Sequence, residues 1–247
     1  MRGLLRGYHE HKNFASCLLS PTRRESTSQF TSARENFVKP LGPGTEVYRF
    51  TLDSVTSSLK LCDKHKFSQF AALSRIALGR AWAELDDAHE GVELIRQGMA
   101  EMLATRNRNG ITAYLQWLSE AQMLGGEIRE ATESIDKAIN EEPTHLFFRP
   151  ENLRLRAALR LKQGNTELAE MGFRESIAVA RRMGAKAWEL RTTMSLARLL
   201  DLEGRRSEGR SMLAEIYGWF TEGFDTADLK EANLLLEELS GTGVRPA

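Results

Sequence analysis

Residues Gly126–Pro143, with the sequence GEIREATESIDKAINEEP, decide the fold of this chain. Their apolar side chains recur every three or four residues and so share one face of a helix: Ile128, Ala131, Ile135, Ala138 and Ile139. A glycine pair precedes this helix, and Pro143 ends it because proline has no amide hydrogen to donate. The order small, large, small and then proline is typical of the second helix of a tetratricopeptide repeat (TPR), where small residues let two helices pack closely.

The same order returns along the chain at a nearly constant interval. Four turns are predicted, each before a helix: Asp86–Asp87, Gly125–Gly126, Gly164–Asn165 and Gly204–Arg205. Small residues follow them at separations of 40, 38 and 40 residues: Gly91, Ala131, Ala169 and Gly209. Large residues stand four positions later, at Ile95, Ile135, Phe173 and Leu213, and three positions further stand Gly98, Ala138, Ser176 and Ile216. This recurrence predicts stacked helical hairpins.

The first helix of each hairpin is predicted before each turn, at Phe67–Leu85, Thr112–Leu124, Glu151–Lys162 and Lys186–Leu202. A helix at Leu52–Lys64 precedes them without an obvious partner. A last helix is expected at Asp228–Leu239, with Asp225 as its cap and Phe224 packed on Leu229.

The sequence therefore predicts an all-α, TPR-like, right-handed solenoid of antiparallel hairpins with a period of about 40 residues. That period exceeds the usual length of about 34 and overlaps the HEAT and armadillo range, but the small–large–small–proline order favours TPR-like hairpins. A generic helical-hairpin solenoid is the alternative. We expect three regions: a basic, Ser/Thr-rich segment of low order at 1–45, the repeat domain at 46–240 and a flexible tail at 241–247.

Composition excludes several classes of function. Thirty-four basic and thirty-four acidic residues cancel, so no net charge attracts nucleic acid or an anionic membrane. No apolar run reaches the roughly 18 residues of a membrane span. The two cysteines, Cys17 and Cys62, cannot form a disulfide framework and fit no zinc motif. We expect a cytoplasmic protein without cofactors, although the Arg- and Ser-rich start is similar in composition to an organelle transit peptide.

The end of the chain resembles a known family. Tyr217–Leu239, YGWFTEGFDTADLKEANLLLEEL, and Ala187–Leu202, AWELRTTMSLARLLDL, are similar to the C-terminal solenoid of bacterial multidomain regulators. Those proteins join a class III adenylate/guanylate cyclase or a DNA-binding domain to a P-loop, signal-transduction ATPase and a TPR-like solenoid. The resemblance covers residues 54–239 and implies a sensor or scaffold in bacterial signalling.

The catalytic parts of that family have no counterpart here. The chain contains no GxxxxGK[ST] loop to bind nucleotide phosphates, and the 53 residues before the solenoid are too few for a cyclase domain. The resemblance therefore implies a module that is not an enzyme, and no catalytic residue is carried over.

Few residues suggest chemistry. His9-Glu10-His11 offers two imidazoles to a metal but has no third ligand, so a solvated tail is the better interpretation. Cys62 is expected to be packed rather than reactive. Core packing is the ordinary role for the four tryptophans, with ligand stacking possible for one of them: Trp82, Trp117, Trp188 and Trp219. Arg181-Arg182 and Arg205-Arg206 are expected at a helix end and in a turn, where nucleic-acid binding is a weak alternative.

The better candidates come from the repeat frame. In stacked hairpins the first helices line a concave face on which peptides dock. The polar positions expected to point into that face are Arg80, Gln116, Glu120, Arg154, Arg191 and Arg198. An arginine-rich groove suits an acidic or carboxylate-bearing peptide, because guanidinium groups bind carboxylates through two hydrogen bonds.

We therefore expect a protein or peptide partner, with no nucleic acid and no membrane. The unpaired helix at the start of the solenoid leaves an apolar edge, which the N-terminal segment, a separate protein or a second copy of the chain would cover, so a homodimer is possible. The alternatives are the detached regulatory part of a cyclase/ATPase-type regulator and a small-molecule sensor.

Overall fold

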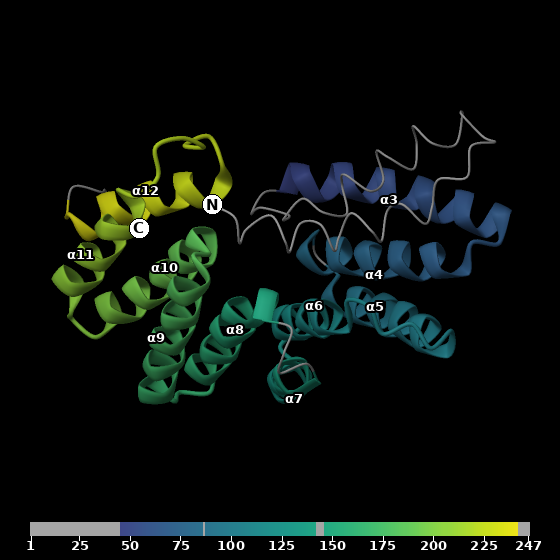
Figure 1. The fold of residues 1–247 in the computed structure, drawn as a ribbon, viewed down its shortest axis with the longest axis horizontal. Coiled ribbons are helices and arrows are strands. Elements are labelled where there is room, and N and C mark those ends of the chain that lie inside the picture. Colours follow the sequence, from purple (N-terminus) through teal and green to yellow (C-terminus); the bar gives the residue numbers. More distant parts are fainter. Residues whose placement is uncertain (1–44, 86, 142–145, 242–247) are drawn as a thin grey trace. The chain divides into compact units, whose positions relative to one another are not determined.

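The computed structural model describes residues 45–85, 87–141 and 146–241, all within one compact unit, Pro40–Ala247. The described residues form α-helices and one short 3-10 helix, with no strand (Figure 1). The helices are α3 (Thr45–His65), α4 (Ser68–Leu85), α5 (Ala88–Ala104), α6 (Ile111–Leu124), α7 (Ile128–Glu141), η1 (Leu146–Phe148), α8 (Arg149–Lys162), α9 (Thr166–Met183), α10 (Lys186–Leu202), α11 (Arg206–Tyr217) and α12 (Ala227–Leu239).

Successive helices pack as hairpins in the predicted order. The pairs α4–α5, α6–α7, α8–α9 and α10–α11 are each joined by a short turn and are in extensive contact. Each second helix also contacts the first helix of the next pair, from α5 with α6 to α11 with α12. The all-α hairpin architecture predicted from the repeat is thus confirmed.

Small residues bring the two helices of each hairpin together. A Cβ atom on Gly79 would lie 2.5 Å from the carbonyl oxygen of Gly91, and one on Gly91 would lie 2.8 Å from the Cβ atom of Ala83. In the second hairpin the hydroxyl of Ser119 donates to the carbonyl of Ala131 at 2.7 Å. The small positions predicted from the sequence are therefore points of backbone contact, where larger side chains do not fit.

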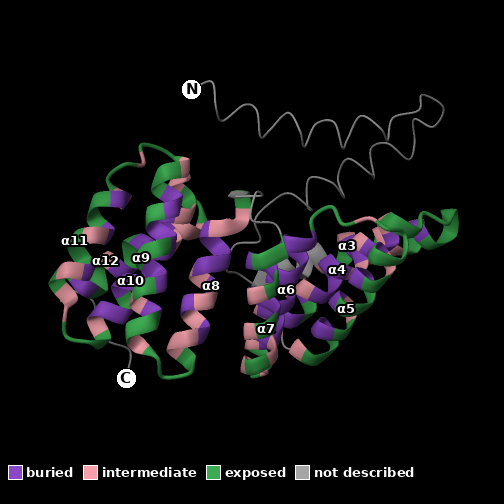
Figure 2. Ribbon diagram, turned by 60° about the horizontal axis from the view of Figure 1, so that its bottom comes forward, coloured by how far each residue is buried: buried purple, intermediate pink, exposed green. Residues whose placement is uncertain are grey.

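The large residues of the repeat fill the space between the helices. Four of them are at most 1% exposed: Ile95, Ile135, Phe173 and Leu213. Figure 2 shows that buried residues lie along the helix surfaces that face other helices. They form three apolar clusters in succession, one mainly on α4–α8, one on α8–α11 and one on α10–α12.

The turns follow the predicted glycines. Gly126, just before α7, has a φ of +79°, a left-handed conformation that costs glycine little. The carboxylate of Asp87 accepts a hydrogen bond from the amide of Glu90 at 3.0 Å and caps α5. Pro143, predicted to end the helix of the opening stretch, lies outside the described residues, and α7 ends at Glu141.

Both ends of the solenoid differ from the prediction. Helix α3 begins at Thr45 instead of Leu52, and it packs against α4 instead of lacking a partner. At the other end, Thr226 and not Asp225 is the N-cap of α12, and Phe224 contacts the ring of Tyr217, 5.8 Å away between centroids. The carboxylate of Asp228, in the first turn of α12, binds an arginine of α10.

Candidate functional site

The first helices of successive hairpins are neighbours. Helix α4 contacts α6, α6 contacts α8, α8 contacts α10, and α10 contacts α12. We call the polar surface along these five helices the first-helix face. All six partner-binding positions predicted from the sequence lie on it: Arg80 on α4, Gln116 and Glu120 on α6, Arg154 on α8, and Arg191 and Arg198 on α10.

The end of the face nearest α4 centres on Glu120. Its carboxylate lies 3.4 Å from the guanidinium of Arg80 and accepts a hydrogen bond from the side-chain amide of Gln116 at 3.2 Å. The guanidinium of Arg80 also lies over the ring of Trp117, 4.9 Å from its centroid. Arg80 of α4 and Gln116 of α6 thus both contact the carboxylate of Glu120, the third predicted residue at this end of the face.

The middle of the face is a buried ion pair on α8. The carboxylate of Glu151, a residue only 3% exposed, accepts two hydrogen bonds from Arg154, at 2.6 and 3.0 Å. Burial by itself would raise the pKa of Glu151, but the charges of Arg154, Arg191 and Arg80 outweigh it, so the pKa lies below its usual value. Burial would lower the pKa of Arg154, and Glu151 raises it instead.

The end of the face nearest α12 holds two further pairs. Arg191 binds Asp228 at 2.7 Å and lies over the ring of Trp188, 5.4 Å from its centroid. Arg198 binds Glu231, also at 2.7 Å. Both pairs join α10 to α12, so the face continues onto the last helix.

Each predicted arginine therefore has a carboxylate of its own chain beside it. The four carboxylates are Glu120, Glu151, Asp228 and Glu231. Sequence reasoning named only Glu120 and missed the other three. Two signals point to them: Glu151 lies three residues before Arg154 on one helix, and Asp228 and Glu231 lie 37 and 33 residues after their arginines, close to one repeat. The face is charge-balanced, so an acidic partner would have to displace a carboxylate.

The core-packing role expected for the tryptophans is confirmed for Trp117, which packs against the first apolar cluster, but not for Trp82 and Trp219. Trp82 is 39% exposed and Trp219 is 58% exposed, and the side chain of Trp219 lies under the ammonium of Lys186. Trp117 and Trp188 are half-buried on the first-helix face. Among the described residues, the aromatic side chains buried in the core include Phe173 and Tyr114.

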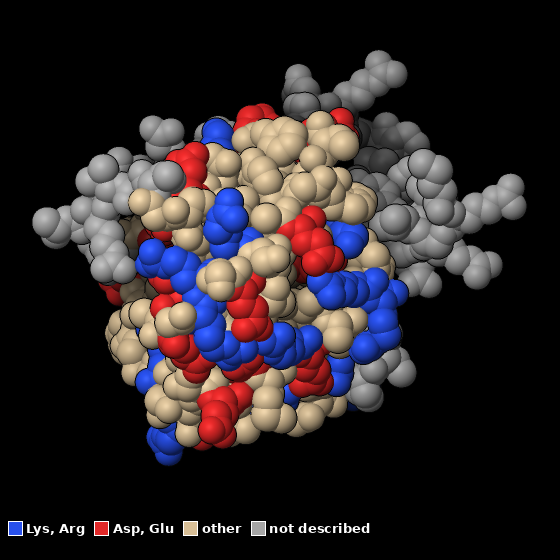
Figure 3. Space-filling model, turned by 90° about the vertical axis from the view of Figure 1, so that its left-hand side faces the viewer, with Lys and Arg blue, Asp and Glu red and all other residues tan. Residues whose placement is uncertain are grey.

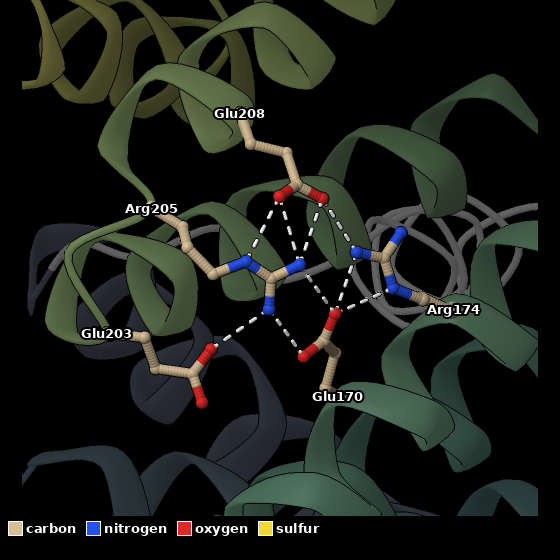
Figure 4. A network of polar contacts seen from close by, with 5 residues as sticks. All are labelled: Glu170, Arg174, Glu203, Arg205 and Glu208. Carbon is tan, nitrogen blue, oxygen red and sulfur yellow. Dashed lines mark hydrogen bonds and ion pairs between the residues drawn. The ribbon is translucent and has the colours of Figure 1, made fainter.

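A second charged network lies away from this face and joins the second helices α9 and α11 (Figure 4). Arg205, in the turn before α11, binds Glu170 at 2.8 Å, Glu203 at 3.2 Å and Glu208 at 2.9 Å. Arg174 on α9 also binds Glu170 and Glu208. Hydrogen bonds from the two arginines lower the pKa of Glu170 and of Glu208. This network ties neighbouring repeats together.

Arg206 follows Arg205 in the Arg-Arg pair predicted to lie in this turn. It binds Asp201 at 2.5 Å. Basic and acidic side chains also lie next to one another across the face shown in Figure 3. Both arginines of the predicted turn are thus engaged by carboxylates of the same chain.

Neither a metal cluster nor a membrane span occurs in the part of the chain that the structure describes. In those ranges, no three His, Cys, Asp or Glu residues are placed to hold a metal ion. His9-Glu10-His11 and Cys17 lie outside these ranges. Cys62 is buried as expected, and burial, with the charge of Asp63, raises the pKa of its thiol. None of the described helices is long and apolar enough to cross a membrane.

Comparisons with known proteins show the fold. No family model matches the chain, and no curated protein matches its sequence. Among solved structures, BtubC (BKLC) from P. vanneervenii matches with a TM-score of 0.62 and 14% identity, covering 79% of this chain and 85% of that one. A second match is a single-residue variant of a Podosopora anserina putative kinesin light chain, described as nearly identical TPR-like repeats. It has a TM-score of 0.56 and 19% identity, and the match covers 77% of this chain and 92% of that one.

The apo form of RapI matches over 98% of this chain and 92% of its own, with a TM-score of 0.55 and 14% identity. The TPR-like solenoid predicted from the sequence is therefore confirmed. The association with cyclase/ATPase regulators, which rests on the resemblance of the C-terminal stretches, stays a prediction.

Proposed function

We propose that this chain is a non-catalytic interaction module that binds a peptide or a partner domain on the first-helix face. The observation that carries this proposal is that all six predicted positions lie on successive first helices and make polar contacts there, from Arg80 with Glu120 to Arg191 with Asp228. Charged side chains along a line of helices suit an extended segment, which offers polar backbone groups at regular intervals. The likeness to TPR-like repeat structures supports the same proposal.

An exposed arginine of this face could exchange the carboxylate of its own chain for a carboxylate of the partner. Arg198, whose side chain is 47% exposed, can leave Glu231 for a carboxylate of a partner at little cost, because an ion pair so open to solvent contributes little. Arg154 differs, because its departure from Glu151 would leave the buried carboxylate of Glu151 without its ion-pair partner. A partner contact is thus expected at Arg198. Arg191 lies two helical turns before it on α10 with its side chain 21% exposed and is expected to make a second contact, whereas Arg154 is expected to hold the face together.

The test is selection of random twelve-residue peptides on the full chain, followed by measurement of their affinity by fluorescence polarisation. We expect the double variant Arg191→Gln/Arg198→Gln to bind the selected peptides about tenfold more weakly, as expected for the loss of a charge-assisted hydrogen bond. The matched control is Arg96→Gln/Arg129→Gln, which removes two arginines of the second helices α5 and α7. Equal losses in both double variants would refute the assignment to the first-helix face.

The finer expectations from the sequence belong to the same proposal. A role in bacterial signalling, with a cyclase or ATPase as the partner, would rest on the resemblance of Tyr217–Leu239 and Ala187–Leu202. Self-association would use α3, which contacts α4 and holds half-buried Leu52, Leu59 and Leu61. A cytoplasmic location is part of the same proposal.

A further inference from the structure

Several buried polar atoms lack hydrogen-bond partners where α4 meets α6. Gln116 is only 4% exposed, and its side-chain nitrogen donates to Glu120. A carboxylate only accepts hydrogen bonds, so the amide nitrogen must face it, and the oxygen Oε1 of Gln116 is left without a donor. Oε2 of Glu120 and Nε of Arg80 are buried without a hydrogen bond as well.

These three atoms belong to one cluster. Arg80 and Gln116 both approach the carboxylate of Glu120, at 3.4 and 3.2 Å. Folded proteins rarely leave buried polar atoms without hydrogen bonds, because each one has lost its hydrogen bond to water. Oε2 of Glu120 is the atom 3.4 Å from the guanidinium of Arg80, so it has an ion-pair partner but no hydrogen bond. Two acceptors, Oε1 of Gln116 and Oε2 of Glu120, and one donor, Nε of Arg80, therefore remain free for the polar groups of a ligand.

The identity of the missing atoms restricts the chemistry of that ligand. A carboxylate or a phosphate has no hydrogen to give to Gln116 and Glu120, and an ammonium group has no acceptor for Arg80. A backbone peptide unit points its N–H and its C=O in opposite directions, so it cannot satisfy donor and acceptors at one spot. A primary carboxamide carries two N–H donors and one C=O acceptor at the same end of a side chain.

We propose that Arg80, Gln116 and Glu120 form a subsite for the side-chain carboxamide of an asparagine or glutamine in the bound peptide. This inference rests on the proposed function, and it names the kind of side chain that the first-helix face selects. The carboxamide N–H groups donate to Oε1 of Gln116 and Oε2 of Glu120, and its oxygen accepts from Nε of Arg80.

Two further features fit a neutral, flat group. The charges of Arg80 and Glu120 cancel, and so do those of Glu151 and Arg154 beside them, so the subsite gains nothing from a charged ligand. The ring of Trp117 already supports the planar guanidinium of Arg80. The side chains of Arg80 and Glu120 are 16% and 14% exposed, so part of each reaches the surface, and the proposal requires the side chain of Arg80 to move when the ligand enters.

The test is an NMR titration of the isotope-labelled full chain with three small probes. The probes are the N-acetyl, N-methylamide derivatives of glutamine, glutamate and alanine, which share two backbone amides and differ only in the side chain. We expect the glutamine probe alone to shift the Nε–H signal of Arg80 and the indole N–H signal of Trp117 in a saturable way. Gln116→Leu should weaken its binding about tenfold, and Gln97→Leu, which alters an exposed glutamine of α5, should leave it unchanged.

Each other outcome has a definite meaning. Equal shifts with the alanine probe would show binding of backbone amides, and stronger shifts with the glutamate probe would show an acidic ligand; either result overturns the proposal. Absence of any shift overturns it too, while peptides selected on the full chain would still support the proposed function. If the glutamine probe binds and no peptide is selected, the subsite stands and the proposed function fails. Gln116→Met, of similar volume, serves as the test variant if Gln116→Leu does not fold.

Discussion

Glu151 illustrates how neighbouring charges reverse the effect of burial on one residue. Its carboxylate is enclosed by protein, which alone would favour the protonated form. Three arginines from α4, α8 and α10 surround it, and Arg154 binds it through two hydrogen bonds. The residue therefore stays ionised, and it orients the arginine that stands at the centre of the first-helix face.

This arrangement predicts how stability depends on pH. Because the pKa of Glu151 is lower in the folded chain than its usual value of 4.5, its contribution to stability is present above that pH and is lost as the pH falls through the folded-state pKa. We expect Glu151→Gln to lower the free energy of unfolding at pH 7 and to reduce its loss between pH 7 and pH 3.5, because glutamine does not titrate. Urea unfolding at the two pH values measures both effects.

The control for this prediction is Glu175→Gln, which removes a half-exposed carboxylate 3.5 Å from Arg156. That variant should keep the pH dependence of the parent chain. A Glu151→Gln chain with an unchanged pH dependence would show that the pair with Arg154 contributes nothing to acid sensitivity.

At the scale of the element, the close approach of two helices depends on glycine. In the first hairpin both sides of the contact are glycines, Gly79 and Gly91, and each would place a Cβ atom 2.5 Å from the carbonyl oxygen of the other. In the fourth hairpin Gly209 faces Ala197, whose backbone atoms would lie 3.0 Å from an added Cβ atom. The first contact is thus the tighter of the two, although the sequence pattern treats both positions as equivalent.

We therefore expect Gly79→Ala to destabilise the chain by about 1–3 kcal/mol, because a backbone carbonyl cannot move away as a flexible side chain can. Gly209→Ala should cost less, because a shift of a few tenths of an ångström is enough and alanine favours the helix. Thermal unfolding followed by circular dichroism measures both losses. A smaller loss for Gly79→Ala than for Gly209→Ala would contradict the packing argument.

At the scale of the whole molecule, the apolar core is divided among successive repeats. One cluster lies mainly on α4–α8, the next on α8–α11 and the last on α10–α12. A solenoid stabilised by contacts between neighbouring repeats can open from one end, because distant repeats share no contacts.

This division predicts a local response to a change in the core. Leu235→Ala removes buried side-chain atoms from the last cluster, at a cost of about 2–4 kcal/mol, and should raise hydrogen exchange in α10–α12 while the amides of α4–α7 keep their protection. Ile95→Ala, in the first cluster, should produce the reverse pattern. Hydrogen exchange followed by mass spectrometry distinguishes the two, and an equal loss of protection along the chain in both variants would indicate a single cooperative unit.

The amino-acid sequence was enough to predict the hairpins of this protein and the positions that pack between their helices. The interval near 40 residues, the small Gly91, Ala131, Ala169 and Gly209, and the large residues after them follow from a helical period that repeats, and each depends mainly on neighbours within one repeat. The six positions of the first-helix face followed from the same frame.

The contacts of those six positions could not be predicted from the sequence and became known from the packing of the helices. The pairs that Arg191 and Arg198 form with Asp228 and Glu231 join residues 37 and 33 positions apart, and the contact of Gln116 with Glu120 leaves specific atoms of Gln116, Glu120 and Arg80 without hydrogen bonds. The physical reason is that a helical period fixes which face a side chain occupies, whereas its partner depends on how neighbouring repeats stack and on which donors and acceptors remain after burial.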